Sequence, residues 1–533
     1  MPSSFPAALK AQSEEALTHP HFDFIAKYHA VSDLRRLARK HAGVLDDKTL
    51  AALEDLLQTR AFRKIRQSYF LFREAASVMT DLVMAPENAP LGAMALASLN
   101  RLLLVTHGNA HRGVAEALGS LPVTIAPPRM PVGKEPHPPA VDWKGLTKSN
   151  GLTVTASPRY IGRSLVVPTD SRDRLLVVKL AKSGDTPEEL AGEIRWMECL
   201  RKPGFSFDRR FHIPVPLLLD GHRLFRMDRL PLSLPTAVNR HPDSIAVAFL
   251  AHPDYFVYPN HHGVDGQSAA EMLARNAYLL GRLTAKGIIH NAPIPLFHNR
   301  TQRLRRDDQG RYQWFRAGRL DQWLDSCRFP NFGLSGLRDF EHLEPLSGGG
   351  QTLYRHIGSH LLSLLLVAGS VFRCRETKRV GWDEKGNPLD TRDLFDRRLL
   401  GTMIREIFRN YYSGVTGSQA SIPLPLPLDA DRLVERMIEE MGVDRHMTEL
   451  LRRADQKALS DSQFFGFLQE RGYNTEQREG IIRGEKDILI KSGPHLGDFN
   501  RQISLPELIE AVAAMSAVCV AGRYAQQKIT GSR

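Results

Sequence analysis

The chain has 533 residues, of which 42% are hydrophobic and 24% are charged, so it has ample apolar sequence for several domains and is not a chain that stays disordered throughout. Its formal net charge is +12. The basic residues are scattered in short groups such as Arg35-Arg36 and Arg209-Arg210, without a long basic helix face. This pattern argues against nucleic-acid binding and suits an anionic nucleotide or an acidic protein partner.

The cysteines and the first residues of the chain indicate the cellular compartment. None of the four cysteines stands in a Cys-x-x-Cys pair, which argues against a zinc ribbon or a disulfide framework and fits a reducing cytoplasm. The first six residues lack the basic and apolar stretches of a secretion signal, and the apolar run from Leu361 to Val367 is too short to cross a bilayer. We therefore expect a cytoplasmic protein with no membrane segment.

Residues 1–121 predict an N-terminal all-helical domain, either a bundle or a HEAT-like stack. Apolar residues recur with a spacing near 3.6 over 31–41, 47–59, 61–83, 91–107 and 110–118. The next segment, 122–141, holds seven prolines, which restrict the backbone and remove hydrogen-bond donors. It predicts an extended linker and a domain boundary.

Residues 142–230 predict a small lobe of strands with one helix. Strands are expected at 151–155, 164–168, 175–180 and within 217–227, and a helix over 187–201. Residues 231–420 predict a mainly helical lobe that begins with an amphipathic helix over 271–286, and 421–533 predicts a helical C-terminal region. A strand-rich lobe before a helix-rich lobe is the order of a protein kinase, so we expect an α+β, bilobal protein-kinase-like domain whose hinge lies at 224–230.

Lys179 stands near the end of the apolar run 175–180, and Glu193 follows in the expected helix. Protein kinases hold the α- and β-phosphates of ATP with a strand lysine that a helix glutamate orients. The alternative is a lysine at a strand edge and a solvated helix glutamate. The pair therefore indicates a nucleotide ligand and does not by itself specify a reaction.

Arg163 follows Gly162 in the turn where a kinase covers the phosphates. The full glycine fingerprint is missing, so Arg163 either pairs with a phosphate directly or is a solvent-facing hairpin arginine. Further on, His290-Asn291-Ala292 stands where a kinase has His-Arg-Asp. Ala292 cannot accept the proton of a substrate hydroxyl, which argues against ordinary transfer to Ser, Thr or Tyr.

Asn331 and Asp339 lie eight residues apart across a glycine-rich turn. An amide oxygen and a carboxylate are hard ligands that suit Mg²⁺. The alternative is a turn asparagine and an Asp339 salt bridge to an arginine. In kinases an asparagine and an aspartate in this order hold the metal.

In these residues and their order the chain resembles the SidJ-related pseudokinases, a family with a kinase-like fold that glutamylates proteins, over about residues 150–420. The resemblance implies that Arg163 and Lys179 bind the phosphates of ATP, that Glu193 orients Lys179, and that Asn331 and Asp339 hold Mg²⁺. It makes Lys179, Glu193 and Asp339 the catalytic set, and it implies that a second nucleotide pocket is lined by His290 and Arg300. The implied chemistry is adenylylation of a carboxylate, followed by attack of an amine to form an isopeptide bond.

Three functions stay open at this point. The first is an ATP- and Mg²⁺-dependent modifier of a protein substrate, the second is a non-catalytic nucleotide-sensing or scaffold pseudokinase, and the third is an atypical kinase. Ala292 disfavours the third, because a carboxylate nucleophile is already ionised at pH 7 whereas a hydroxyl needs a base. Calmodulin is not supported as a partner, because the C-terminal part of the sequence has no Ile-Gln motif.

Overall fold

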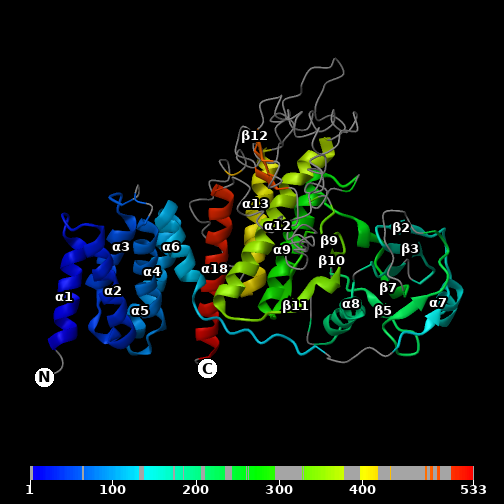
Figure 1. The fold of residues 1–533 in the computed structure, drawn as a ribbon, viewed down its shortest axis with the longest axis horizontal. Helices are drawn as coiled ribbons and strands as arrows, with labels where there is room; N and C mark the ends of the chain where they lie inside the picture. The colour runs from blue at the N-terminus through cyan, green and yellow to red at the C-terminus, as the bar shows by residue number, and fades with distance from the viewer. Residues whose placement is uncertain are drawn as a thin grey trace, which may run out of the picture.

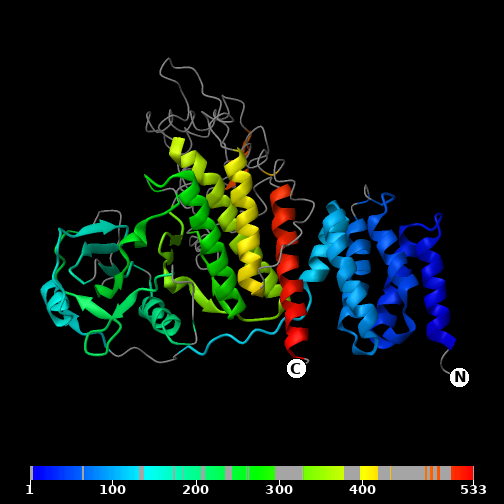
Figure 2. The same ribbon diagram turned by 180° about the vertical axis from the view of Figure 1, so that it is seen from behind.

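The computed structural model describes residues 4–62, 65, 67–130, 137–171, 174–183, 185–203, 205, 211–233, 243–259, 261, 263–294, 327, 329–376, 397–417, 433, 474–476, 481–483, 489–491 and 506–531. Three parts lie in a row (Figure 1; Figure 2). N-terminal helices form one end, a twisted sheet forms the other, and a helical bundle lies between them. The protein is thus a mixed α/β structure with an N-terminal helical region.

The N-terminal part consists of the helices α1 (Ser4–Thr18), α2 (Phe24–Lys40), α3 (Asp47–Gln58), α4 (Ser68–Met84), α5 (Ala89–Val105) and α6 (Gly108–Gly119). Helix α4 is the central one, because it packs against α2, α3, α5 and α6 and most of its residues are buried. Asp46 caps α3 by accepting hydrogen bonds from the backbone of Lys48 and Thr49. The expected boundaries agree within a few residues except for α4, which begins at Ser68 instead of 61, and for α1 and the first turns of α2, which were not expected.

Residues 120–130 leave the end of α6 and run along the base of the bundle (Figure 1). Gly287, with φ of +71°, lies so close to Pro127 that an added Cβ would come within 2.8 Å of its Cα. The proline-rich segment ends in the strand β1 (Ala140–Val141), so its last residues belong to the sheet and the linker is shorter than 122–141.

The seven-stranded sheet has the order β1-β6-β7-β4-β3-β2, with β5 also paired to β7. Its further strands are β2 (Arg159–Ile161), β3 (Ser164–Pro168), β4 (Leu175–Leu180), β5 (Val215–Leu217), β6 (Phe225–Met227) and β7 (Ile245–Ala251). Only β1 and β6 are parallel. Helices α7 (Trp143–Ser149) and α8 (Pro187–Leu200) accompany the sheet.

The sheet differs from the sequence-based expectation in two places. All seven residues of strand β7 are buried, and β7 pairs with β4, β5 and β6. The expected hinge at 224–230 is therefore wrong, because β6 lies inside the sheet, and a lobe boundary at 230 would cut the sheet apart. Residues 151–155 were also expected as a strand, but they contribute only a bridge between Val154 and Thr169, and the strands that pair with β3 are β2 and β4.

The bundle contains α9 (Gly266–Ala285), α12 (Gly350–Glu376) and α13 (Arg397–Thr416), with the short strands β8 (Ile288–His290), β9 (Phe332–Gly333), β10 (Gly336–Leu337) and β11 (Leu343–Pro345) beside it. Helices α9 and α13 approach closely at Gly281 and Gly414, where a Cβ on either residue would overlap the backbone of the other helix. Leu361 to Val367 form a buried stretch of α12.

Helix α18 (Pro506–Gly531) lies between the N-terminal helices and the bundle and packs against α6, α12 and α13 (Figure 2). Lys528 Nζ donates to Val83 O (2.8 Å) at the end of α4, where a cation complements the helix dipole. The region 421–533 also contains the three-stranded sheet β12 (Asn474–Glu476), β13 (Ile481–Arg483) and β14 (Leu489–Lys491), so it is not wholly helical as expected.

Two helical segments, Pro86–Val105 and Leu508–Gly531, are long and apolar enough to cross a membrane by length and composition, and 39% and 61% of their apolar windows are buried within the fold. Since helices of a protein core pass the same test, this is weak evidence for a membrane span.

Candidate functional site

Lys179 is the centre of a buried ionic cluster. It lies on β4 with Ser164 and Val247 as its neighbours on β3 and β7, and its residue is only 3% exposed. Its Nζ lies 2.9 Å from Glu193 Oε2 and 2.8 Å from Asp339 Oδ1. A buried ammonium group is costly unless carboxylates compensate it, and here two of them do so directly. The alternative of a strand-edge lysine does not describe this geometry.

Helix α8 brings Glu193 to this lysine. Thr186 and Glu189 form a capping box and Pro187 occupies the first turn, so the start of the helix is fixed by its sequence. Glu193 then faces inward and is completely buried. Burial raises the pKa of Glu193 to about 7, and the nearby Lys179 offsets part of that rise. Its carboxyl group therefore titrates near neutral pH.

Asp339 reaches the cluster from a separate segment, after the β9–β10 hairpin and before the 3₁₀ turn η5 (Phe340–His342). Its φ of +48° and ψ of +60° place it in the left-handed region, which is unusual for a residue other than glycine and is common at functional sites. Burial alone would raise the pKa of Asp339, but Lys179 and Arg338 outweigh it and hold that pKa well below its usual range.

Arg163 follows Gly162 (φ +58°) in the turn between β2 and β3. Its side chain is 11% exposed and forms ion pairs with Asp185 and Glu341. Burial would lower the pKa of Arg163, but these two carboxylates raise it, so the guanidinium stays charged. Arg163 is thus not a solvent-facing hairpin arginine.

Glu341 completes the cluster from η5. Both of its carboxylate oxygens accept hydrogen bonds from Arg163, and its Oε2 lies 3.5 Å from Lys179 Nζ. Burial would raise the pKa of Glu341, but Lys179 and Arg163 lower it to about 2. Four carboxylates, those of Asp185, Glu193, Asp339 and Glu341, therefore surround Arg163 and Lys179, and Arg338 and Lys182 are further cations beside them.

Arg338, next to Asp339, is buried in an aromatic pocket. Its guanidinium lies 5.1, 4.6 and 4.7 Å from the ring centroids of Tyr255, Phe256 and Tyr258. Two of these rings come from the 3₁₀ turn η3 (Pro253–Phe256), in the segment that joins β7 to α9. Because arginine–aromatic contacts are stabilising, Arg338 connects this segment to the one that carries Asp339.

His290 and Asn331 form hydrogen bonds to the same segment. His290 Nε2 donates to Arg338 O (3.0 Å), and its Nδ1 accepts from Ala292 N (3.2 Å). Asn331 Nδ2 donates to Ala292 O (2.8 Å), while Asn331 O accepts from Arg338 N (2.8 Å). The side chain of Asn331 thus bonds to Ala292, whereas Asp339 Oδ1 accepts a hydrogen bond from Lys179 Nζ.

The expected metal pair, Asn331 and Asp339, stays a prediction, since the Asn331 amide bonds to Ala292 and the Asp339 carboxylate to Lys179. Within the described ranges, no group of three or more His, Cys, Asp or Glu side chains is arranged to hold a metal ion by itself. Arg300 lies outside the described residues. The sequence analysis missed Glu341 and Asp185, although Asp339-Phe340-Glu341 places a second acid where a kinase has the glycine of Asp-Phe-Gly.

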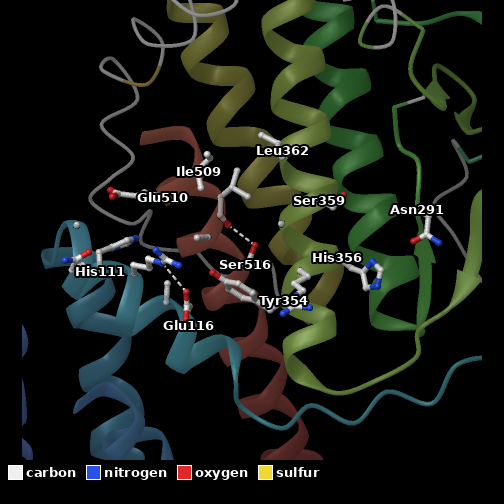
Figure 3. Close-up of a pocket in the computed structure, with 18 of the residues that line it drawn as sticks. His111, Glu116, Asn291, Tyr354, His356, Ser359, Leu362, Ile509, Glu510 and Ser516 are labelled. Carbon is white, nitrogen blue, oxygen red and sulfur yellow. Dashed lines mark hydrogen bonds and ion pairs between the residues drawn. The ribbon is translucent and has the colours of Figure 1, made fainter. Parts of the chain in front are cut away.

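A cavity of about 870 Å³ lies on the other side of His290, between α6, α12 and α18. His111, Tyr354, His356 and Ser516 line it, and Asn291 reaches its edge from the end of β8 (Figure 3). His290 on β8 therefore contacts both this cavity and, through Arg338 O, the segment of Asp339. Strand β8 pairs with β11, which follows that segment along the chain. Sequence reasoning missed the cavity because its walls come from three distant parts of the chain.

Fold and site together define a mixed α/β protein in which a buried lysine, held by a helix glutamate and a distant aspartate, lies where the sheet meets the bundle. No protein-family model matches the chain. A similar protein is the calmodulin-dependent glutamylase SidJ of Legionella pneumophila, which is 25% identical over 222 residues. These are 38% of this chain and 25% of SidJ, so the chain matches only a quarter of that relative's length. The similarity supports a distant SidJ-related relationship.

Proposed function

We propose that this protein is an ATP- and Mg²⁺-dependent protein modifier of the glutamylase type, built on a bilobal kinase-like domain. The sheet with α8 would be the small lobe, and α9, α12 and α13 would belong to the large one, with the hinge in the segment between β7 and α9. The observation that carries the proposal is the pairing of Lys179 with both Glu193 and Asp339 at 2.9 and 2.8 Å. Kinases place these three residue types in this order around the phosphates of ATP.

The residues of the site fit a magnesium-bound nucleotide. Arg163 and Lys179 are cations that already hold an acidic group, Glu341, between them. Asp339 would supply a carboxylate and Asn331 an amide for a hard cation. Because the protein offers few metal ligands, phosphate oxygens and water would complete the coordination. The ion would neutralise phosphate charge when bound.

The same residues suit a carboxylate nucleophile better than a hydroxyl. Ala292 is buried and carries no group that accepts a proton. In the proposed reaction a carboxylate of a protein substrate attacks the α-phosphorus, and pyrophosphate leaves; the amine of glutamate then displaces AMP to form an amide. Arg163 and Lys179 would stabilise the negative charge that develops on the phosphate oxygens, and Glu193 would keep Lys179 in position.

His290 and Arg300 are proposed to take part in a second nucleotide pocket, as the family resemblance implies. The support for His290 is its place on the wall of the cavity between α6, α12 and α18. Dependence on calmodulin belongs to the name of SidJ and is not carried over, because three quarters of SidJ lie outside the match. A cytoplasmic location remains part of the proposal.

A nucleotide-sensing pseudokinase without catalysis is the second candidate. One observation favours it: Glu341 contacts both Arg163 and Lys179, the two cations proposed to bind phosphate. Such an occupied site could bind a nucleotide without turning it over. The two candidates share the nucleotide site and differ in turnover, so binding is the first property to measure.

Titration calorimetry with Mg-ATP tests the shared site. The wild-type protein is expected to bind, and Lys179→Ala is expected to lose more than about tenfold in affinity because it removes a charge-assisted phosphate contact. Lys148→Ala is a suitable control, because Lys148 is exposed on α7. Equal affinities for all three proteins would remove Lys179 from the nucleotide site.

A further inference from the structure

Glu341 occupies the space between the two cations that are proposed to bind phosphate. Its two oxygens both face Arg163, and Oε2 also lies 3.5 Å from Lys179 Nζ. Both contacts come from one guanidinium nitrogen, Nη2, and a phosphate oxygen can accept from the same donor. The side chain of Glu341 is only 12% exposed, so this contact is part of the interior and not a loose surface pair.

The cluster can release Glu341 without leaving either cation unpaired. Lys179 would keep Glu193 and Asp339, and Arg163 would keep Asp185. This matters because removing the partner of a buried charge is strongly destabilising only when no other partner remains. Glu341 also belongs to a three-residue 3₁₀ turn, and such short turns can rearrange locally more easily than a long helix.

The negative charge of Glu341 also opposes the entry of a phosphate. The Glu341 carboxylate forms ion pairs with both Arg163 and Lys179. A phosphate that approaches the two cations meets this fixed negative charge and must displace it. The other carboxylates, by contrast, approach Lys179 from α8 and from Asp339 just before η5, or Arg163 from the loop at Asp185.

We propose that Glu341 is an internal competitor of the nucleotide: it holds Arg163 and Lys179 in the free protein and must leave them before a phosphate binds. This inference rests on the proposed function. It makes Glu341 the residue that sets the affinity of the site, and it predicts that removing its charge improves binding even though the residue lies within the binding machinery.

The test is titration calorimetry of Glu341→Gln and wild type with Mg-ATP, and with pyrophosphate in the absence of metal. The glutamine has the same size but no charge, so both ligands are expected to bind about tenfold tighter to the variant. Glu344→Gln is the matched control, because Glu344 is an exposed residue of β11 only three positions away. Its affinities are expected to equal those of wild type.

Other outcomes contradict the inference in distinguishable ways. Equal affinity of wild type and Glu341→Gln would overturn the competitor and leave the nucleotide site intact. Weaker binding of the variant only when Mg²⁺ is present would overturn it and assign Glu341 to the metal. No binding by either protein would overturn the competitor and the proposed function together. If Glu341→Gln fails to fold, Glu341→Asp carries the test, since its shorter side chain weakens the contacts and is also expected to bind both ligands more tightly than wild type.

Discussion

Lys179 Nζ lies 2.8 Å from Asp339 Oδ1, although the two residues are 160 positions apart and belong to different parts of the fold. The contact joins the central sheet to the segment that follows the β9–β10 hairpin. It orients the Lys179 side chain on β4, and it brings the proposed phosphate ligand Lys179 next to the proposed metal ligand Asp339.

Asp339→Asn is expected to weaken the binding of Mg-ATP by about tenfold or more, because an amide replaces the carboxylate that would contact the metal. The binding of ATP without Mg²⁺ is expected to change less, since Lys179 and Arg163 remain. Calorimetry at equal ionic strength with and without Mg²⁺ measures both effects. Asp228→Asn is the control, because Asp228 is exposed after β6. Equal losses with and without metal would contradict a metal-binding role for Asp339.

Glu193 is expected to make thermal stability depend on pH. Burial raises its pKa to about 7 in the folded protein from a usual value of 4.5. Between these two values the folded state keeps a proton that the unfolded state has lost, so the contribution of Glu193 to stability falls as the pH rises from 4.5 to 7. Glu193→Gln removes this dependence, and its Tm relative to wild type should increase from pH 5 to pH 7.5. A constant difference in Tm over that range would show that Glu193 does not titrate there.

His360 links the bundle to β8 and is expected to matter for stability. Its Nε2 donates to His290 O (3.0 Å), and its Nδ1 accepts from the hydroxyl of Tyr411 (2.7 Å). His360→Phe removes the donor to His290 O and one partner of the Tyr411 hydroxyl, which keeps Thr284 Oγ1 at 3.1 Å. We therefore expect a loss of about 1–3 kcal/mol in the free energy of unfolding at pH 7.5.

The same substitution should show a second effect at lower pH. Burial lowers the pKa of His360 to about 3, so the unfolded chain gains a proton below pH 6.5 that the folded protein does not take up. Wild type should therefore lose stability relative to His360→Phe as the pH falls from 6.5 to 5. Denaturant unfolding at three pH values tests this, and a gap that widens toward acid would be the contrary result.

Gly281→Ala should destabilise the bundle by about 2 kcal/mol or more, because the new methyl group would overlap the backbone of Tyr411 and lie 3.0 Å from Val415 N on α13. Gly192→Ala provides the matched control, since Gly192 is also helical and has open space around its Cα. That variant should be neutral or more stable by up to about 1 kcal/mol, because alanine favours helices. Similar melting temperatures for both variants would contradict the close packing of α9 and α13.

Much of the fold could be predicted from local patterns. The helices of the N-terminal part follow the apolar spacing, and β3, β4 and α8 follow from short apolar runs and a capping sequence. Strand β7 was not predicted, because Ile245–Ala251 is a continuous apolar run that by itself fits a strand or a helix. The neighbours of a buried strand decide between the two, and sequence spacing does not reveal them.

The site was predictable as a set of residues and not as a set of contacts. The order of Lys179, Glu193 and Asp339 indicated a nucleotide site because kinases share it. The role of Glu341 depends on the turn in which Asp339 takes a left-handed conformation, and no pattern of residue types specifies such a turn when the residue is not glycine. The cavity beside His290 is a property of packing between α6, α12 and α18, and it likewise has no local signal.

The most direct test of the proposed function follows the fate of the two ends of ATP. The protein is incubated with Mg²⁺, glutamate, a candidate protein substrate and ATP labelled on either the α- or the γ-phosphate, alongside Lys179→Ala, and with activator preparations added where turnover is absent. We predict that α-label appears in AMP or transiently on protein, that γ-label leaves only in pyrophosphate, and that Lys179→Ala abolishes both. Transfer of γ-label to Ser, Thr or Tyr would contradict the account and identify a protein kinase instead.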